Sequence, residues 1–162
     1  MKILISNDDG IFAPGIKALV SAFAKAGHEV YVAAPDSQRS AASHSMTLFR
    51  PLTAKETAFE GAVKAWAIDG TPVDCVKLAV ETLCPEVEAV LSGINHGYNA
   101  GSDVLYSGTV GAATEGALSG KPAMAVSLGY EREDTYDKAA ALAVKVFSKL
   151  REQPLPAYSV LN

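Results

Sequence analysis

Cysteine is scarce in this sequence, and the two that occur are not spaced for a metal or redox motif. Cys75 and Cys84 lie in apolar surroundings, without a CxxC motif or a neighbouring Cys/His cluster. Buried free thiols are therefore favoured over a disulfide or a zinc site, and a reducing compartment is the expected setting.

Long apolar runs and an excess of positive charge are also missing. No stretch approaches the roughly 18 apolar residues of a membrane span, and the run after Met1-Lys2 is too short for a secretory signal. The net charge of -4 argues against a nucleic-acid duplex or a membrane as partner, because both need a basic face. We therefore expect a cytoplasmic protein, and a small anionic substrate stays open because a metal ion inverts the local charge.

Short buried-type strands alternate with segments of helical spacing along the 162 residues. The expected strands are 2–7, 29–34, 63–68, 88–92 and 123–128, and the expected helices are 14–26, 71–83, 110–118 and 134–150. This order predicts one α/β domain over 1–162, with a mostly parallel sheet covered by helices on both faces, that is, three layers. The end of the chain, 157–162, has the pattern of a strand that has just begun, which suggests an incomplete version of a longer chain.

Polar residues gather where the expected strands end. Asn7-Asp8-Asp9-Gly10 follows the first strand, a Ser-rich loop over 36–47 follows the second, and 92–95 follows the fourth. Because the carboxyl ends of parallel strands share one edge of the sheet, and ligands bind beyond that edge, we expect these segments to form one site.

The adjacent carboxylates Asp8 and Asp9 are the strongest indication of a metal site. Two neighbouring carboxylates at the end of a buried strand repel each other, and a divalent cation relieves that repulsion. Ser40 and Asn95 offer neutral oxygens, so the donor set favours Mg²⁺ or Mn²⁺. The alternative interpretation of Asp8-Asp9-Gly10 is an ordinary turn or a helix N-cap.

Ser107-Gly108-Thr109 precedes an expected helix whose free N–H groups would attract an anion. The commoner use of such residues is a simple N-cap. In the Ser-rich loop, His44 suits proton donation to a leaving oxygen, although a lone loop histidine is more often an ordinary polar residue. Tyr98 and Tyr106 have rings suited to stacking on a base.

Five motifs in order make the sequence resemble the survival protein SurE family across nearly its whole length. They are ILISNDDGIFAPGI at 3–16, VAAPDSQRSAASHS at 32–45, DGTPVDCVKLA at 69–79, LSGINHGYNAGSDVLYSGTVGAATEGAL at 91–118 and PAMAVSL at 122–128. The resemblance implies a Rossmann-like fold and a metal-dependent nucleotidase that acts on nucleoside 5′- and 3′-monophosphates. It also implies one divalent ion per subunit and a homodimer or homotetramer.

The resemblance also assigns roles to residues. The metal ligands fall on Asp8, Asp9, Ser40 and Asn95, and the phosphate side falls on Ser107, Gly108 and Thr109, with Asn99 nearby. From the residues themselves we also expect Asp8 and Asp9 to be catalytic and Ser43 and His44 to lie on the substrate side. Two departures stand out. The family commonly has Gly-Pro-Asn where this chain has Gly97-Tyr98-Asn99, and its members usually continue well beyond the position of Asn162.

The sequence-based hypothesis is metal-assisted hydrolysis of a phosphomonoester, with one aspartate taking a proton from the attacking water. The rival hypothesis is a receiver-like phosphoacceptor domain, in which Asp69 would complete the acidic pocket and Lys121-Pro122 would supply the lysine. A dinucleotide-binding module is disfavoured, because no GxGxxG follows the first strand.

Overall fold

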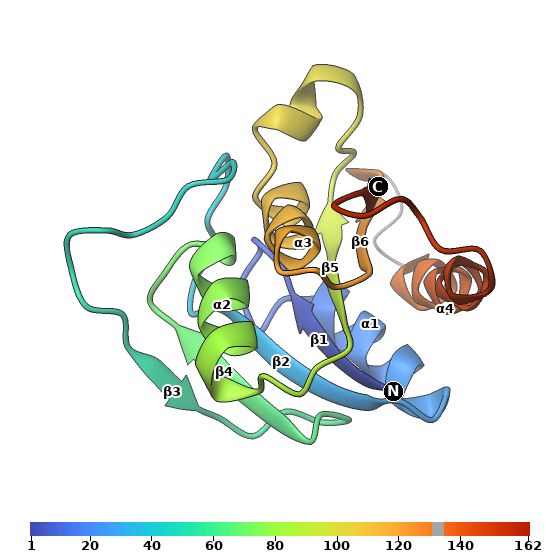
Figure 1. Cartoon of the computed structure of the whole chain (residues 1–162), viewed down its shortest axis with the longest axis horizontal. Helices are drawn as coiled ribbons and strands as arrows, with labels where there is room; N and C mark the ends of the chain where they lie inside the picture. The colour runs from blue at the N-terminus through green and yellow to red at the C-terminus, as the bar shows by residue number, and fades with distance from the viewer. Residues whose placement is uncertain (131–134) are drawn as a thin grey trace.

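A single seven-stranded sheet organises the molecule (Figure 1). The computed structural model describes residues 1–130 and 135–162. The strand order is β3-β4-β2-β1-β5-β6-β7, and all neighbours are parallel except β3 and β4. The strands are β1 Lys2–Ser6, β2 Glu29–Pro35, β3 Ala54–Glu56, β4 Lys64–Ile68, β5 Ala89–His96, β6 Ala123–Leu128 and β7 Val160–Leu161.

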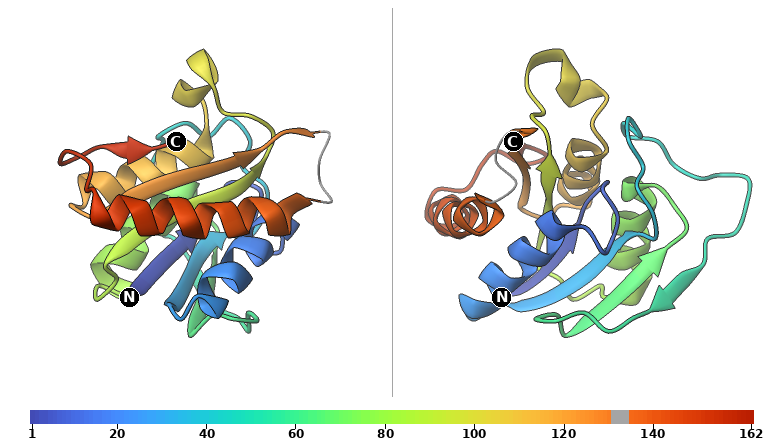
Figure 2. Two further views of the ribbon diagram at one scale, coloured as in Figure 1. Left: turned by 90° about the vertical axis from the view of Figure 1, so that its right-hand side faces the viewer. Right: turned by 180° about the vertical axis from the view of Figure 1, so that it is seen from behind.

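Helices cover both faces of this sheet (Figure 2). They are α1 Pro14–Lys25, α2 Pro72–Leu78 with a π-helical continuation η1 Ala79–Leu83, the 3₁₀ helix η2 Gly101–Leu105, α3 Gly108–Leu118 and α4 Tyr136–Glu152. The helices α1 and α4 pack together on one face, and α2 and α3 on the other. The expected three-layer α/β architecture is therefore confirmed.

Alternation along the strands divides the core into two halves. Ile3 and Ile5 of β1 belong to the cluster under α1 and α4, whereas Leu4 between them belongs to the cluster under α2. All three side chains are fully buried, because a central parallel strand is covered on both faces. Trp66 lies in the second cluster, and the two free cysteines are buried.

Thr71 and Asp74 cap the start of α2. The Thr71 hydroxyl accepts from the Asp74 N–H at 3.1 Å, and the Asp74 carboxylate accepts from the Thr71 N–H at 2.8 Å. This reciprocal capping box satisfies two N–H groups that lack intrahelical partners, and Pro72 occupies the first turn without losing a hydrogen bond.

The sequence-based element boundaries are wrong in two places. The edge strand β3 was not expected, because it is short, polar and without apolar alternation. The strand expected over 88–92 is longer in the structure, where β5 runs to His96 across an irregularity between Ser92 and Asn95. The Asp134 start that the sequence predicts for the last helix lies outside the described residues, within which that helix runs from Tyr136 to Glu152.

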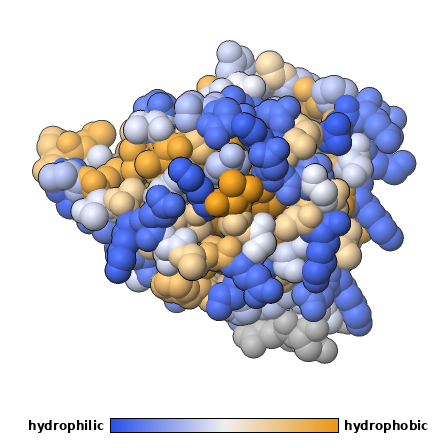
Figure 3. Space-filling model, turned by 90° about the horizontal axis from the view of Figure 1, so that it is seen from below, coloured by the Kyte–Doolittle hydropathy of each residue, from blue (hydrophilic) through white to orange (hydrophobic). Residues whose placement is uncertain are grey.

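In the described part of the chain, no helix combines the length and apolarity that crossing a membrane requires. The face of the molecule seen from below mixes hydrophilic side chains with small apolar areas (Figure 3).

Candidate functional site

The turn after β1 places two aspartates at the carboxyl edge of the sheet. Asn7 is fully buried, and its side-chain amide donates to the Gly10 carbonyl at 2.9 Å. Gly10 has a φ of +98°, a conformation that favours glycine. Sequence reasoning did not assign Asn7 a role, and its position directly after a buried strand was the available signal.

Asp8 joins this turn to the beginning of α3. Its carboxylate accepts a hydrogen bond from the Thr109 hydroxyl, and its carbonyl accepts from the Arg39 N–H at 2.8 Å. A Cβ placed on Gly108 would lie 2.9 Å from the Asp8 Cβ, so only glycine allows this approach. The start of α3 therefore lies directly against the turn that carries Asp8.

Asp9 contacts the end of β5. Its Oδ2 accepts from the His96 N–H at 3.1 Å. The His96 ring lies edge-on to the Tyr130 ring at a centroid distance of 5.1 Å, and its Nδ1 is 3.2 Å from the Tyr136 hydroxyl. His96 is a further residue that sequence reasoning missed, although it stands next to the expected ligand Asn95.

Burial dominates the electrostatics of the pair. Desolvation raises the pKa of Asp8, the Thr109 hydroxyl opposes that shift, and the neighbouring Asp9 charge adds to it. Desolvation likewise raises the pKa of Asp9, partly offset by the His96 N–H. Both carboxylates are thus destabilised in their charged form, a condition that a bound cation reverses.

Ser40 and Asn95 each stand one residue from a contact with the pair. Ser40 follows Arg39, whose N–H binds Asp8, and Asn95 precedes His96, whose N–H binds Asp9. The Asn95 side-chain nitrogen donates to the Gly97 carbonyl at 2.9 Å, so the side-chain oxygen is the atom that would face a cation.

These residues fit a hard divalent cation. Among residues 1–130 and 135–162, no group of three or more His, Cys, Asp or Glu side chains is arranged to hold a metal. Two carboxylates with hydroxyl and amide oxygens are instead the ligands that Mg²⁺ and Mn²⁺ prefer.

The residues expected on the phosphate side already have protein partners. The Ser107 hydroxyl accepts from the Val110 N–H at 3.1 Å, so Ser107 acts as an ordinary N-cap of α3. The Thr109 hydroxyl donates to the Asp8 carboxylate. The Asn99 side chain donates to the Ser127 hydroxyl at 2.9 Å. The Thr109 N–H also interacts with the Asp8 carboxylate, so the Gly108 N–H is the donor at this helix start that an anion would meet.

Ser43 and His44 hold the Ser-rich loop against its neighbours. The Ser43 hydroxyl donates to the Leu105 carbonyl at 2.7 Å, and His44 Nε2 lies 3.1 Å from Oε2 of Glu115 on α3. Glu115 is nearly buried and also lies 3.4 Å from the Lys77 ammonium group. In this arrangement His44 contacts α3 about two turns beyond Gly108, and its role toward a substrate stays a prediction.

The sequence of this chain matches a known protein family over nearly its whole length. The family model described as Survival protein SurE matches residues 3–162. The chain belongs to the SurE family. A relative named 5′-nucleotidase SurE, from a Cyanothece species, is 51% identical over 165 residues, covering 100% of this chain and 61% of that protein. Another of the same name, from Desulforudis audaxviator, is 52% identical over 145 residues, covering 88% of this chain and 56% of that protein.

A solved SurE structure shares this fold. The crystal structure of the SurE protein from Aquifex aeolicus superposes with a TM-score of 0.86 at 37% identity, covering 97% of this chain and 62% of that one. The chain therefore spans about three fifths of the length of the SurE proteins that it matches.

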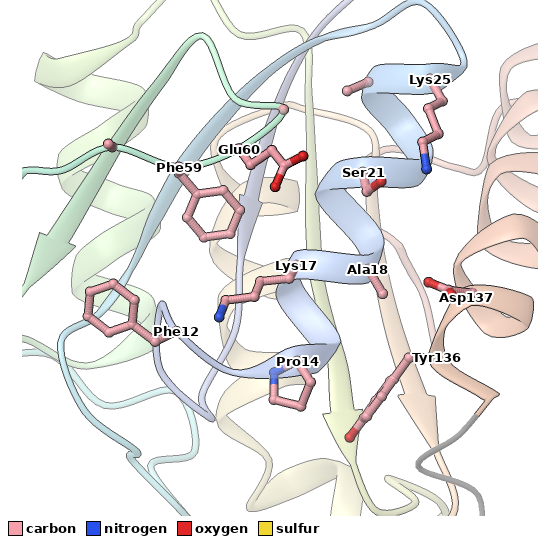
Figure 4. Close-up of a pocket in the computed structure, with 13 residues that line it drawn as sticks. Phe12, Pro14, Lys17, Ala18, Ser21, Lys25, Phe59, Glu60, Tyr136 and Asp137 are labelled. Carbon is pink, nitrogen blue, oxygen red and sulfur yellow. The ribbon is translucent and has the colours of Figure 1, made fainter.

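A separate hollow of about 860 Å³ lies against α1, away from the SurE acidic pair (Figure 4). Lys17 extends from α1 toward the rings of Phe12 and Phe59, and Tyr136 and Asp137 approach from α4. Neither aspartate of the pair lines this hollow. The candidate site is instead the open carboxyl edge of the sheet, where Asp9 is partly exposed and Ser40 is exposed.

Proposed function

We propose that this chain is a divalent-metal-dependent phosphomonoesterase that removes phosphate from nucleoside 5′- and 3′-monophosphates. The observation that carries the proposal is the contact of the buried Asp8 carboxylate with Thr109 and Gly108 at the start of α3. It brings a cation-binding pair and an anion-binding helix start together, as metal-assisted cleavage of a phosphate ester requires. Relatives named 5′-nucleotidase SurE, which share 51% and 52% of their aligned residues with this chain, support the same substrate class.

Each residue has a role that follows from its contacts. Asp8, Asp9, Ser40 and Asn95 would hold one ion per subunit, either Mg²⁺ or Mn²⁺. A bound ion supplies positive charge that polarises the phosphoryl oxygens. We expect the helix start at Ser107, Gly108 and Thr109 to bind the phosphate, with Asn99, Ser43 and His44 as further residues toward the substrate.

Asp9 is the better proton acceptor of the pair. Its Oδ2 is occupied by the His96 N–H, which leaves Oδ1 to take a proton from the attacking water. Asp8 is fixed by Thr109 and serves mainly to hold the ion.

We further propose that residues 1–162 form one nucleotidase domain and that the protein is a cytoplasmic homodimer or homotetramer. The shared core beneath a single sheet supports the first point. The two buried free thiols suit a reducing compartment. The assembly rests on the family resemblance alone.

The receiver-like alternative is not supported. The family match is to SurE proteins over residues 3–162. Asp69, which would complete a receiver pocket, instead accepts from the Thr53 N–H at 2.8 Å and pairs with Arg50 at 3.0 Å. Its carboxylate is thus held near β3, at the edge of the sheet.

The direct test is Asp9→Asn, assayed for phosphate release from a nucleoside 5′-monophosphate with Mn²⁺. We expect a loss of at least about 100-fold in kcat, because metal-ion catalysis supplies several kcal/mol. Asp137→Asn, the same change at an exposed position on α4, is the matched control and should keep full activity. Near wild-type turnover by Asp9→Asn, or turnover that survives exhaustive chelation, would refute the proposal.

A further inference from the structure

Tyr98 and Tyr130 lie beside the candidate site, and each is preceded by a glycine. The ring of each tyrosine packs against the glycine that precedes the other tyrosine. A Cβ added to Gly129 would lie 2.4 Å from both Cζ and the hydroxyl oxygen of Tyr98. A Cβ added to Gly97 would lie 2.5 Å from Cζ of Tyr130. The Tyr98 ring therefore packs directly on the backbone before Tyr130, and the Tyr130 ring on the backbone before Tyr98.

Hydrogen bonds hold the two segments together. The Gly97 N–H donates to the Leu128 carbonyl at 2.7 Å, and the Asn99 side chain donates to the Ser127 hydroxyl at 2.9 Å. These bonds continue the parallel pairing of β5 with β6, the adjoining strands in Figure 1. The backbone segments that carry both rings are thus held together by the sheet before any ligand binds.

Both rings are nonetheless mostly exposed. Tyr98 is 70% and Tyr130 is 67% accessible, whereas Trp66 and Tyr136 are buried. A large aromatic surface that is fixed in position yet open to water loses little conformational entropy when a flat ligand covers it. This combination is typical of a stacking surface rather than of core packing.

The pair adjoins the residues that would hold the ion and the phosphate. The Tyr130 ring contacts the His96 ring, and the His96 N–H binds Asp9. Tyr98 is next to Asn99 and three residues from Asn95. A ligand whose phosphate binds the ion held by Asp8 and Asp9 can therefore extend along the end of β5 toward both rings.

We propose that Tyr98 and Tyr130 form a stacking subsite for the nucleobase of the substrate. The inference rests on the proposed nucleotidase function and adds the residues that recognise the base. Every base offers an aromatic face, so this subsite binds purine and pyrimidine nucleotides alike and favours the larger purines. Tyr98 is also the residue at which the Gly97-Tyr98-Asn99 segment departs from the Gly-Pro-Asn pattern.

The test compares a nucleoside 5′-monophosphate with ribose 5-phosphate, which has the same phosphate and sugar but no base. Tyr98→Ala and Tyr130→Ala should each raise KM for the nucleotide about tenfold, since base stacking is worth about 1–3 kcal/mol per base. Neither substitution should change kcat or KM for ribose 5-phosphate. Tyr98→Phe and Tyr130→Phe keep the ring and should behave as wild type.

Tyr158→Ala is the matched control. Tyr158 is 72% exposed but lines a hollow with Met1, at the opposite end of the sheet, so its loss should affect neither substrate. Gly129→Ala provides an independent test, because its added methyl group would displace the Tyr98 ring without deleting it. It should reproduce the KM increase of Tyr98→Ala.

Two outcomes overturn the inference. One is an equal loss on both substrates, which would mean that the tyrosines only support the segment carrying Asn95 and Asn99. The other is unchanged KM for the nucleotide in both alanine variants. If the wild-type chain turns over neither substrate, the proposed function fails, and calorimetric titration with each compound and Mn²⁺ decides the subsite. Equal affinity of the wild-type chain for nucleotide and ribose 5-phosphate would then overturn it.

Discussion

At the scale of single residues, the missing side chain of Gly108 determines how the acidic pair meets α3. A Cβ at this position would lie 3.0 Å from Oδ2 of Asp8 as well as close to its Cβ. Asp8 is nearly buried, so its carboxylate has little room to move aside. The position of one carboxylate oxygen therefore depends on the absence of one methyl group.

We predict that Gly108→Ala lowers kcat by about 100-fold, because a displacement of about 1 Å at a reacting group has effects of that size. Alanine favours the helix more than glycine does, which offsets part of the steric cost to stability. Steady-state kinetics together with a thermal unfolding curve measure both effects. Full activity in a folded variant would mean that Asp8 need not occupy its observed position.

Sequence reasoning predicted these contacts unevenly. It expected the segments after the first and second strands to meet, because parallel strands end on the same side of a sheet, and the Arg39 N–H does bind the Asp8 carbonyl. It did not predict Glu115 as the partner of His44. A single glutamate in a helix of small residues carries no local sign of which distant loop it will contact.

At the scale of elements, the Ser-rich loop is fastened to α2 at its far end. The N–H and hydroxyl of Thr47 donate to the Asp74 carboxylate at 2.9 and 2.6 Å, and the Thr71 hydroxyl donates to the Ser45 carbonyl at 2.7 Å. With Ser43 bound to Leu105, these contacts hold the loop that carries Ser40. The N-terminus of α2 thus supports the site from outside it.

The pH dependence of stability should show the contribution of Asp74. Burial acts to raise its pKa, but the hydrogen bonds from Thr47 and Thr71 together lower it below the ordinary value of 3.8. The Asp74 carboxylate therefore binds a proton less readily in the folded state than in the unfolded chain. Its contribution to the free energy of unfolding is complete above about pH 4 and declines as the pH falls further.

We accordingly predict that Asp74→Asn lowers the free energy of unfolding by about 2 kcal/mol at neutral pH, because buried hydrogen bonds to a charged group are lost. The difference in free energy of unfolding between this variant and wild type should become smaller below about pH 4. Urea unfolding at several pH values measures this, with the exposed Asp103→Asn as control. A gap that stays constant down to about pH 2 would contradict the assignment.

Elements with strong periodicity were predictable, and those defined by pairing were not. The helix α1 and strand β2 have nearly the predicted bounds, because their apolar spacing matches their burial. The strand β3 forms only because β4 offers an open edge, and the last residues of β5 pair with β6 despite an irregularity. Such pairing depends on residues far away in the sequence, so no local pattern reveals it.

At the scale of the whole molecule, the candidate site joins segments that the fold alone brings together. The ends of β1 and β5, the Ser-rich loop and the start of α3 all contact Asp8 or Asp9. An ion bound by residues from three of these segments would favour the folded state, because the unfolded chain lacks the site.

We predict that Mn²⁺ at about 100 times its dissociation constant increases the free energy of unfolding by about 2.7 kcal/mol. The midpoint of thermal unfolding should rise with Mn²⁺ concentration for wild type and return to the starting value with a chelator. Asp9→Asn should respond much less, and Asp137→Asn should respond fully. An unchanged wild-type midpoint would show that no such ion binds.

Neighbouring parts of the molecule approach the helix α3 closely at three of its glycines. Besides Gly108 against Asp8, a Cβ on Gly111 would lie 2.3 Å from the Ser43 carbonyl oxygen, and one on Gly116 would lie 2.5 Å from the Val90 Cβ. Each neighbour belongs to a different part of the molecule. Random mutagenesis should therefore recover almost no larger residues at these three positions. Libraries designed to broaden specificity would be better directed at the mostly exposed segment before the helix, 101–106.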